Sequence, residues 1–178
     1  MRVSAEYPAD IEEIAAVTHV AFAANEHFPS PLDDLGRPVE VGLVHRLRAT
    51  EAWIPGLSLV ARDGTEMVGH ILGTRAHVGD VPVLALGPLS VLPGRWRQGI
   101  ARTLLTAFVA EADARNEPLV ALLGDPAFYS RFGFVLSTGL GIDPPVEEWI
   151  PHFQVLPLRA YDPEIRGPFT YAGPFMDM

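Results

Sequence analysis

The stretch from Leu84 to Phe108, LALGPLSVLPGRWRQGIARTLLTAF, constrains the fold of this chain more than any other segment. It predicts a strand, a turn broken by Pro and Gly, and then a long amphipathic helix that begins at Gly99. The first backbone N–H groups of a helix have no partner within the helix, and the helix dipole adds positive charge there. Because a glycine lets a ligand approach the backbone closely, this arrangement predicts an anion site suited to phosphate.

The charges near this glycine differ from those of the whole chain. Arg95, Arg97 and Arg102 surround it, whereas the chain carries a net charge of −9. A phosphate site of this kind is typical of proteins that bind a nucleotide-containing cofactor. The overall acidity argues against a nucleic-acid or anionic-membrane partner, and it suits a cationic substrate such as an amine.

Length and composition predict one globular, cytoplasmic domain. The 178 residues are enough for a core, and 48% hydrophobic with 20% charged residues is typical of soluble proteins. The chain has no apolar run of about 18 residues, and its first residues lack the apolar region of a secretory signal. The absence of cysteine excludes disulfides and thiol catalysis, and the six histidines show no metal-binding spacing, so no metal is expected.

Hydrophobic periodicity predicts elements in the order ααβββαβαβ, with helices on both faces of a mixed sheet. Asp10 and Glu13 resemble a capping box at the start of the first helix. Turns at Asp63-Gly64 and Gly79-Asp80 separate three strands, which therefore form an antiparallel meander. The predicted helices are 10–24, 39–50, a third from 100 that ends before Pro118, and 126–132; the predicted strands are 57–62, 66–78, 81–91, 119–123, 134–137 and 153–158.

Two segments carry a resemblance to a known family. Trp96–Ala101, WRQGIA, is similar to the cofactor motif Gln/Arg-x-x-Gly-x-Gly/Ala of the GNAT superfamily of N-acetyltransferases, with Trp96 in place of the first Gln or Arg. Ala127–Phe134, AFYSRFGF, matches that family's Ala-x-x-Tyr-x-Lys/Arg-x-Gly-Phe pattern. The chain resembles specifically the YhbS-like branch, closely over residues 57–137 and more loosely at the ends.

The resemblance implies the acyl-CoA N-acyltransferase (GNAT) fold, an α/β (α+β) fold with a mostly antiparallel sheet whose middle strands splay apart. It implies one domain over residues 1–178, with a core of about 1–140 and a C-terminal strand extension of about 141–178. Acetyl-CoA would be the acyl donor. Its pantetheine arm would pair with the backbone of Leu89, Ser90 and Val91. Its pyrophosphate would bind main-chain N–H groups in the run Arg97, Gln98, Gly99, Ile100, Ala101 and Arg102.

By the same resemblance, Tyr129 is the general acid that protonates the departing thiolate. The expected activity is acetyl transfer to a primary amine by direct attack, because the chain has no cysteine to carry an acyl group. A non-catalytic acyl-CoA-binding or regulatory protein is the alternative. A third hypothesis is a structural member of the fold in which Trp96 fills the cofactor slot.

The acceptor and the general base stay open at this stage. A small-molecule or peptide amine fits, and its pocket is expected between the first two helices and the later loops. His70, Glu26 and His27 are weak candidates for the base, and none is assigned. Dimerisation is common in this superfamily, but the sequence does not determine the oligomeric state.

Overall fold

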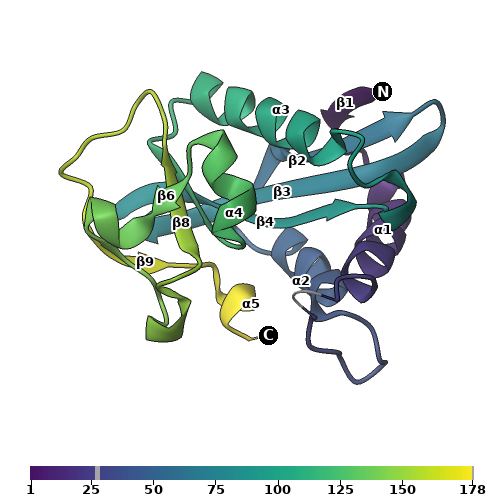
Figure 1. Cartoon of the computed structure of the whole chain (residues 1–178), viewed down its shortest axis with the longest axis horizontal. Helices are drawn as coiled ribbons and strands as arrows, with labels where there is room; N and C mark the ends of the chain where they lie inside the picture. Colours follow the sequence, from purple (N-terminus) through teal and green to yellow (C-terminus); the bar gives the residue numbers. More distant parts are fainter. Residues whose placement is uncertain (27–28, 178) are drawn as a thin grey trace.

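A mostly antiparallel sheet with helices on both faces forms the centre of the computed structural model, which describes residues 1–26 and 29–177 (Figure 1). The main path of the sheet has the order β1-β2-β3-β4-β5-β8-β6, and β9 pairs with the end of β3 and with β7. The strands are β1 Arg2–Ala5, β2 Trp53–Asp63, β3 Glu66–Val78, β4 Val81–Val91, β5 Leu119–Leu123, β6 Val135–Leu136, β7 Ile142–Asp143, β8 Phe153–Pro157 and β9 Gly167–Thr170.

The helices divide between the two faces. In Figure 1, α1 (Ile11–Ala23), α2 (Val39–Arg48) and α5 (Gly173–Met176) lie on one side of the sheet, and α3 (Ile100–Ala114) and α4 (Pro126–Tyr129) lie on the other. Each face has its own buried cluster, because the apolar stripe of each helix packs against alternate residues of the strands. No helix in the described part of the chain is long and apolar enough to cross a membrane.

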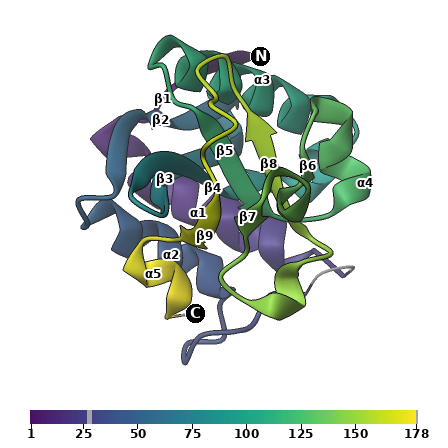
Figure 2. The same ribbon diagram turned by 90° about the vertical axis from the view of Figure 1, so that its left-hand side faces the viewer.

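The C-terminal segment brings together parts of the chain that are distant in the sequence. Figure 2 shows β9 and α5 close to α2, and α2 and α5 are in contact. The β8 strand pairs with β5 along its length and with β6 on its other edge. The C-terminal segment is therefore part of the sheet and of the core.

The feature that positions the site is the separation of β4 from β5. These parallel neighbours pair only at Leu84 with Val120 and at Ala85 with Ala121. The register between β3 and β4 shifts just after this point, from Gly73 opposite Leu86 to Ile71 opposite Leu89, so β4 carries one extra residue. This is a β-bulge, and it bends β4 away from β5. Within the described residues, the rest of β4 has no partner in β5, which confirms the expected splayed strands.

Most predicted elements are confirmed within a few residues, and the bounds of β3 and β4 are as predicted. The predicted capping box is wrong. The Asp10 carboxylate accepts from the Tyr7 N–H at 2.8 Å, and Glu13 accepts from the Met67 N–H at 3.1 Å. Both carboxylates also bind Arg62, at 2.7 and 2.6 Å, so they attach α1 to the β2–β3 hairpin instead of capping the helix.

Candidate active site

The predicted phosphate site lies at the start of α3. Gly99 is the N-cap residue with φ +80°, and Arg97 also has a positive φ of +63°. The first helical bond runs from the Thr103 N–H to the Gly99 carbonyl at 2.9 Å, and among the described residues no side chain accepts a hydrogen bond from the N–H groups of this first turn. The N–H groups that precede Thr103 therefore have no partner within the helix. A Cβ on Gly99 would meet open space, so glycine is required here by the backbone conformation and not by packing.

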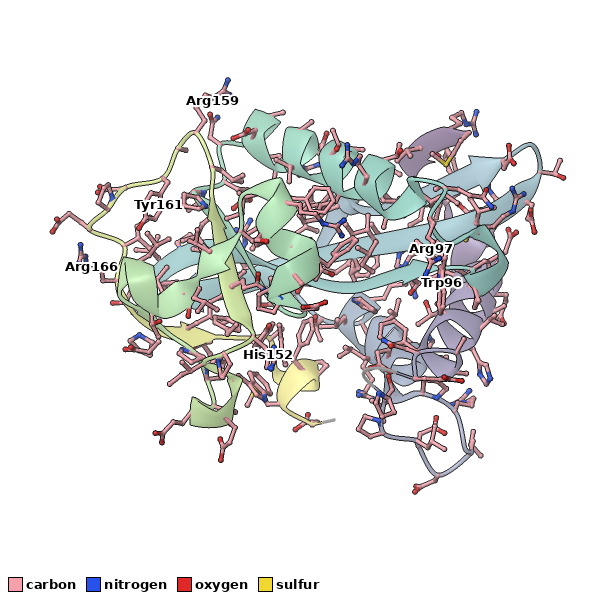
Figure 3. All side chains as sticks on the ribbon, viewed as in Figure 1. Trp96, Arg97, His152, Arg159, Tyr161 and Arg166 are labelled. Carbon is pink, nitrogen blue, oxygen red and sulfur yellow. The ribbon has the colours of Figure 1, made fainter. Side chains whose placement is uncertain are left out.

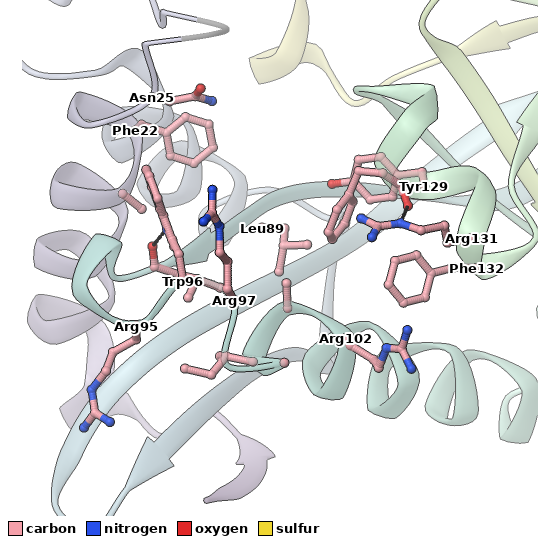
Figure 4. Close-up of a pocket in the computed structure, with 16 residues that line it drawn as sticks. Phe22, Asn25, Leu89, Arg95, Trp96, Arg97, Arg102, Tyr129, Arg131 and Phe132 are labelled. Carbon is pink, nitrogen blue, oxygen red and sulfur yellow. Dashed lines mark hydrogen bonds between the residues drawn. The ribbon is translucent and has the colours of Figure 1, made fainter.

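A cavity of about 700 Å³, called here the first cavity, opens in front of these N–H groups (Figure 4). Its walls come from the end of α1, the end of β4, the start of α3 and the α4 region. The residues that line it are Ala21, Phe22, Asn25, Leu89, Val91, Arg95, Trp96, Arg97, Gly99, Ile100, Ala101, Arg102, Phe128, Tyr129, Arg131 and Phe132.

Three arginines make the first cavity positive within an acidic chain. Figure 4 shows Arg97 on the α1 side and Arg102 and Arg131 on the side of α3 and α4. Arg95 is different, because its guanidinium forms ion pairs with Asp63 at 3.0 Å and Glu66 at 2.5 Å. Within residues 1–26 and 29–177, none of the other three forms an ion pair with a carboxylate. Their charge is therefore available to an anionic ligand.

Tyr129 is held in place by the strand-to-helix turn that follows β5. The Asp125 carboxylate caps α4 by accepting from the Ala127 N–H at 2.9 Å. A Cβ on Gly124 would lie 2.5 Å from Cε2 of Tyr129, so only glycine lets the ring occupy this position. The ring packs edge-on against Phe134, with 5.6 Å between centroids. Figure 4 shows the hydroxyl directed into the cavity, toward the side where Leu89 lies.

The surroundings of Tyr129 keep its hydroxyl protonated. Burial of the phenol, with a smaller contribution from the negative charge of Asp125, raises the pKa of Tyr129 above its ordinary value of 10.0. The group is therefore a proton donor throughout the neutral range. This is the state that a general acid needs before the reaction.

A second cavity, of about 540 Å³, adjoins the first. It lies between the α1–α2 segment, the β4 bulge, the end of β5 and the C-terminal segment. In Figure 3, Trp96 and Arg97 mark the first cavity and His152, beside α5, marks the second. The two cavities share a wall made of Phe22, Asn25, Leu89, Phe128 and Tyr129. A group in the first cavity and a group in the second can therefore meet next to the Tyr129 phenol.

The structure brings most of the predicted site residues to the first cavity. Two of them do not line it with their side chains. Ser90 is buried, with its Oγ 3.4 Å from the Thr18 hydroxyl, and the Gln98 amide lies 3.4 Å from the Gly94 carbonyl. The predicted residues that line the cavity are Leu89, Val91, Arg97, Gly99, Ile100, Ala101, Arg102 and Tyr129. Ser90 was predicted to pair its backbone with pantetheine, and Gln98 to contact the pyrophosphate through its backbone N–H. The positions of their side chains therefore do not test these roles, which remain predictions.

The structure argues against the candidates for the general base. His70 is completely buried and lines neither cavity, and its Nε2 lies 2.8 Å from the Ser58 hydroxyl. Burial, helped by the positive charge of Arg48, lowers the pKa of His70 to about 3. Glu26 also lines neither cavity. His27 lies outside the described residues.

Trp96 forms a wall of the first cavity instead of filling it. Its indole N–H donates to the Val91 carbonyl at 2.9 Å, and 47% of the residue stays exposed. Figure 4 shows it between α1 and Arg97. The sequence analysis considered Trp96 as a departure from the motif and as a possible plug of the cofactor slot, and it missed Phe22 and Asn25, which reach the site through folding. Arg131, which was not among the predicted cofactor-binding residues, also lines the cavity.

Comparison with known proteins agrees with this geometry. A family model described as the acetyltransferase (GNAT) family matches residues 24–134. The uncharacterized N-acetyltransferase YhbS of Escherichia coli is 31% identical over 140 residues, which is 77% of this chain and 75% of that protein. A second uncharacterized N-acetyltransferase of Escherichia coli, YjhQ, is 35% identical over 104 residues, or 56% of this chain. The chain spans only 58% of the length of YjhQ.

Two solved structures cover nearly all of the chain. The crystal structure of YhbS from Escherichia coli in complex with CoA has a TM-score of 0.84 and 26% identity, covering 98% of this chain and 91% of that one. A GNAT family acetyltransferase from Brucella melitensis in complex with acetyl-CoA has a TM-score of 0.76 and 29% identity, covering 98% and 97%. Both neighbours therefore share the whole architecture, including the C-terminal segment.

Proposed function

This chain belongs to the acetyltransferase (GNAT) family, and on that premise we propose that it moves the acetyl group of acetyl-CoA to a primary amine by direct attack on the thioester. The observation that carries the proposal is the junction of two cavities at Tyr129. One cavity has the unpaired N–H groups and arginines that a diphosphate needs, and the other leaves room for an acceptor. A non-catalytic acyl-CoA binder needs only the first.

We assign the pyrophosphate of acetyl-CoA to the main-chain N–H groups at the start of α3. Arg97, Arg102 and Arg131 would add charge-assisted hydrogen bonds to the phosphates. The β4 backbone at Leu89–Val91 lies along the route from this site to Tyr129, and it has no β5 partner within the described residues. The Trp96 indole already bonds the Val91 carbonyl, so this carbonyl serves the pantetheine arm only if the indole moves.

The proposed reaction balances without an acyl-enzyme. The neutral amine attacks the thioester carbon, a C–N bond forms and the C–S bond breaks. Tyr129 donates its proton to the departing sulfur, and the proton lost by the amine passes to water and restores the phenol. Proton transfer from a positioned group contributes about 10²–10⁴-fold to a rate. The products are the acetylated amine and CoA with a free thiol.

Release of the CoA thiol in the presence of a panel of primary amines tests this function. The chain's Lys and Arg residues, 13 together, are all arginine, so no lysine side chain can consume acetyl-CoA by self-acetylation. We expect amine-dependent thiol release and an acetylated product detected by mass spectrometry. Tight binding of acetyl-CoA with no thiol release for any amine would favour the non-catalytic binder. Failure to bind acetyl-CoA would contradict the proposed cofactor site and favour a structural member of the fold that does not bind the cofactor.

A further inference from the structure

Glu40 is a carboxylate in the second cavity that the proposed reaction does not use. It lies in the first turn of α2, and one of its oxygens, Oε1, accepts from the Ser30 hydroxyl at 2.8 Å. Its other oxygen, Oε2, is buried and has no hydrogen-bond partner within residues 1–26 and 29–177. None of the ion pairs in this part of the chain includes it. An ionised carboxylate in this position is stabilised when a cation enters the cavity.

The surroundings of Glu40 favour a cation with an apolar stem. Burial raises the pKa of the carboxyl group more than its hydrogen bonds with its own backbone N–H and with the Ser30 hydroxyl lower it. Among the residues that the structure describes, the other walls of the second cavity are largely aromatic and aliphatic, with Asp125 and His152 as the further titratable groups besides the tyrosines. The aromatic and aliphatic residues are Phe22, Leu43, Leu86, Leu89, Leu122, Leu123, Phe128, Tyr129, Trp149, Tyr171 and Phe175. Aromatic faces also attract a cation directly.

The position of Glu40 separates it from the reacting atoms. It lines the second cavity but is not part of the wall that the two cavities share. An amine that attacks the thioester has to reach the shared wall at Tyr129, and it has to be neutral when it attacks. A carboxylate stabilises the charged form of an amine. The group that Glu40 binds is therefore a different one from the attacking amine.

Building on the proposed function, we propose that Glu40 binds a second positive charge on the acceptor. The preferred acceptor then has two basic groups joined by an apolar stem, with one group at Glu40 and the other at Tyr129. Small diamines and short peptides with an arginine beside a free N-terminus share this chemistry. Glu40 would thus determine which amines are used, without taking part in bond making.

Matched pairs of acceptors test the proposal in the intact protein. We would compare 1,5-diaminopentane with pentylamine, which has the same stem and one charge fewer. In a second arm we would compare Gly-Arg amide with Gly-norleucine amide. For the wild type, we expect kcat/KM to favour the doubly charged member of at least one pair by about tenfold or more, mainly through KM. A preference in the diamine pair would indicate a small diamine as the acceptor, and a preference in the peptide pair would indicate a peptide with an arginine next to its free N-terminus.

Glu40→Gln is the diagnostic variant, because it removes the charge and keeps an oxygen for Ser30. We expect its preference within each pair to fall to near one. Glu51→Gln is the control, because this glutamate is exposed and lines neither cavity, so the preference should stay as in the wild type. Thermal unfolding of both variants checks that they fold. A wild-type preference near one in both arms, or a preference that survives in Glu40→Gln, would overturn the proposal.

A binding measurement separates this proposal from the proposed function. Calorimetry of 1,5-diaminopentane and of Gly-Arg amide with the protein–CoA complex needs no acetyl transfer. Binding that Glu40→Gln weakens about tenfold, without thiol release from any amine, would support the Glu40 site and contradict the transferase. Thiol release without any difference between paired acceptors would support the transferase and contradict the Glu40 site.

Discussion

Tyr129 is the residue on which the proposed chemistry depends. Its ring is positioned by Gly124 and Phe134, so Tyr129→Phe should keep the packing and remove only the hydroxyl. We expect kcat to fall by about 10²-fold or more, with little change in acetyl-CoA affinity. Thiol release and calorimetry measure the two quantities. Tyr7→Phe, at an exposed tyrosine, is the matched control. An unchanged kcat in Tyr129→Phe at every pH would show that another group protonates the thiolate.

His70 has a structural role that predicts how stability depends on pH. Its pKa is lowered to about 3 in the folded protein from an ordinary value of 6.5, chiefly by burial. Glu6, 3.8 Å from Nε2, would favour a proton on the ring, but Glu6 is itself paired with Arg48 at 3.1 Å. Between pH 6.5 and 3 the unfolded chain therefore binds more protons at this residue than the folded one, so the free energy of unfolding falls as pH falls.

Below pH 6 we expect the free energy of unfolding to fall by about 1.4 kcal/mol for each pH unit. Above about pH 7 this histidine is neutral in both the folded and the unfolded chain, so it no longer changes the free energy of unfolding with pH. Denaturant unfolding at pH 7.5, 6 and 5 measures it. His70→Gln should unfold more easily at pH 7.5 and should lose less stability than the wild type on going to pH 5. His77→Gln, at an exposed histidine of the same strand, should behave as the wild type. Equal slopes for all three proteins would contradict the assignment.

Single residues were predictable from sequence where the motif is local. Gly99 was predicted from the start of the third helix, whereas Tyr129 was identified from its place in the family motif, and both line the first cavity. Phe22, Asn25 and Glu40 come from segments whose own patterns indicate only a helix or a loop. They reach the cavities because α1 and α2 cross the sheet next to the β4 bulge, which no local pattern encodes.

The turn from β4 to α3 is the element that would form the proposed phosphate site. Any other residue at position 99 would have to adopt the left-handed backbone conformation of Gly99, which costs L-residues about 1–2 kcal/mol. In Gly99→Ala we expect the turn to shift, lowering the free energy of unfolding by roughly that amount and acetyl-CoA affinity by about tenfold. Gly94→Ala is the control, because this nearby glycine has no positive φ and an added Cβ meets open space. Equal acetyl-CoA affinity in both variants would place the pyrophosphate elsewhere.

Strands with a clear run of hydrophobic residues were predicted well, including β5 and β8, which pair with each other, whereas some short strands were not. The meander β2-β3-β4 follows from strand periodicity and two glycine turns, and its strands pair in sequence order. The short β1 and β9 strands were missed, because each is only 4 residues long and pairs with a strand far away in the sequence. The separation of β4 from β5 was expected from the family resemblance alone.

At the scale of the whole molecule, we infer that residues 1–178 form one domain and that the C-terminal extension is needed for it to fold. The β8 strand lies between β5 and β6, so its loss would remove a partner from both. Phe153, Phe169, Tyr171 and Phe175 form a chain of ring contacts with centroid distances of 5.0, 4.8 and 4.5 Å. These rings belong to the same buried cluster as α1 and α2.

Ending the chain after residue 140 should therefore leave no cooperative fold. Complete burial of one such aromatic side chain contributes about 3–5 kcal/mol, judged from its truncation to alanine, and a domain is stable by only about 5–15 kcal/mol in total. Phe169→Ala is the milder test, and we expect a lower midpoint in denaturant without loss of acetyl-CoA binding, because Phe169 lines neither cavity. Circular dichroism and denaturant unfolding measure both variants. A shortened chain that still unfolds cooperatively would show that residues up to 140 form a complete domain, with the extension serving only to enclose the second cavity.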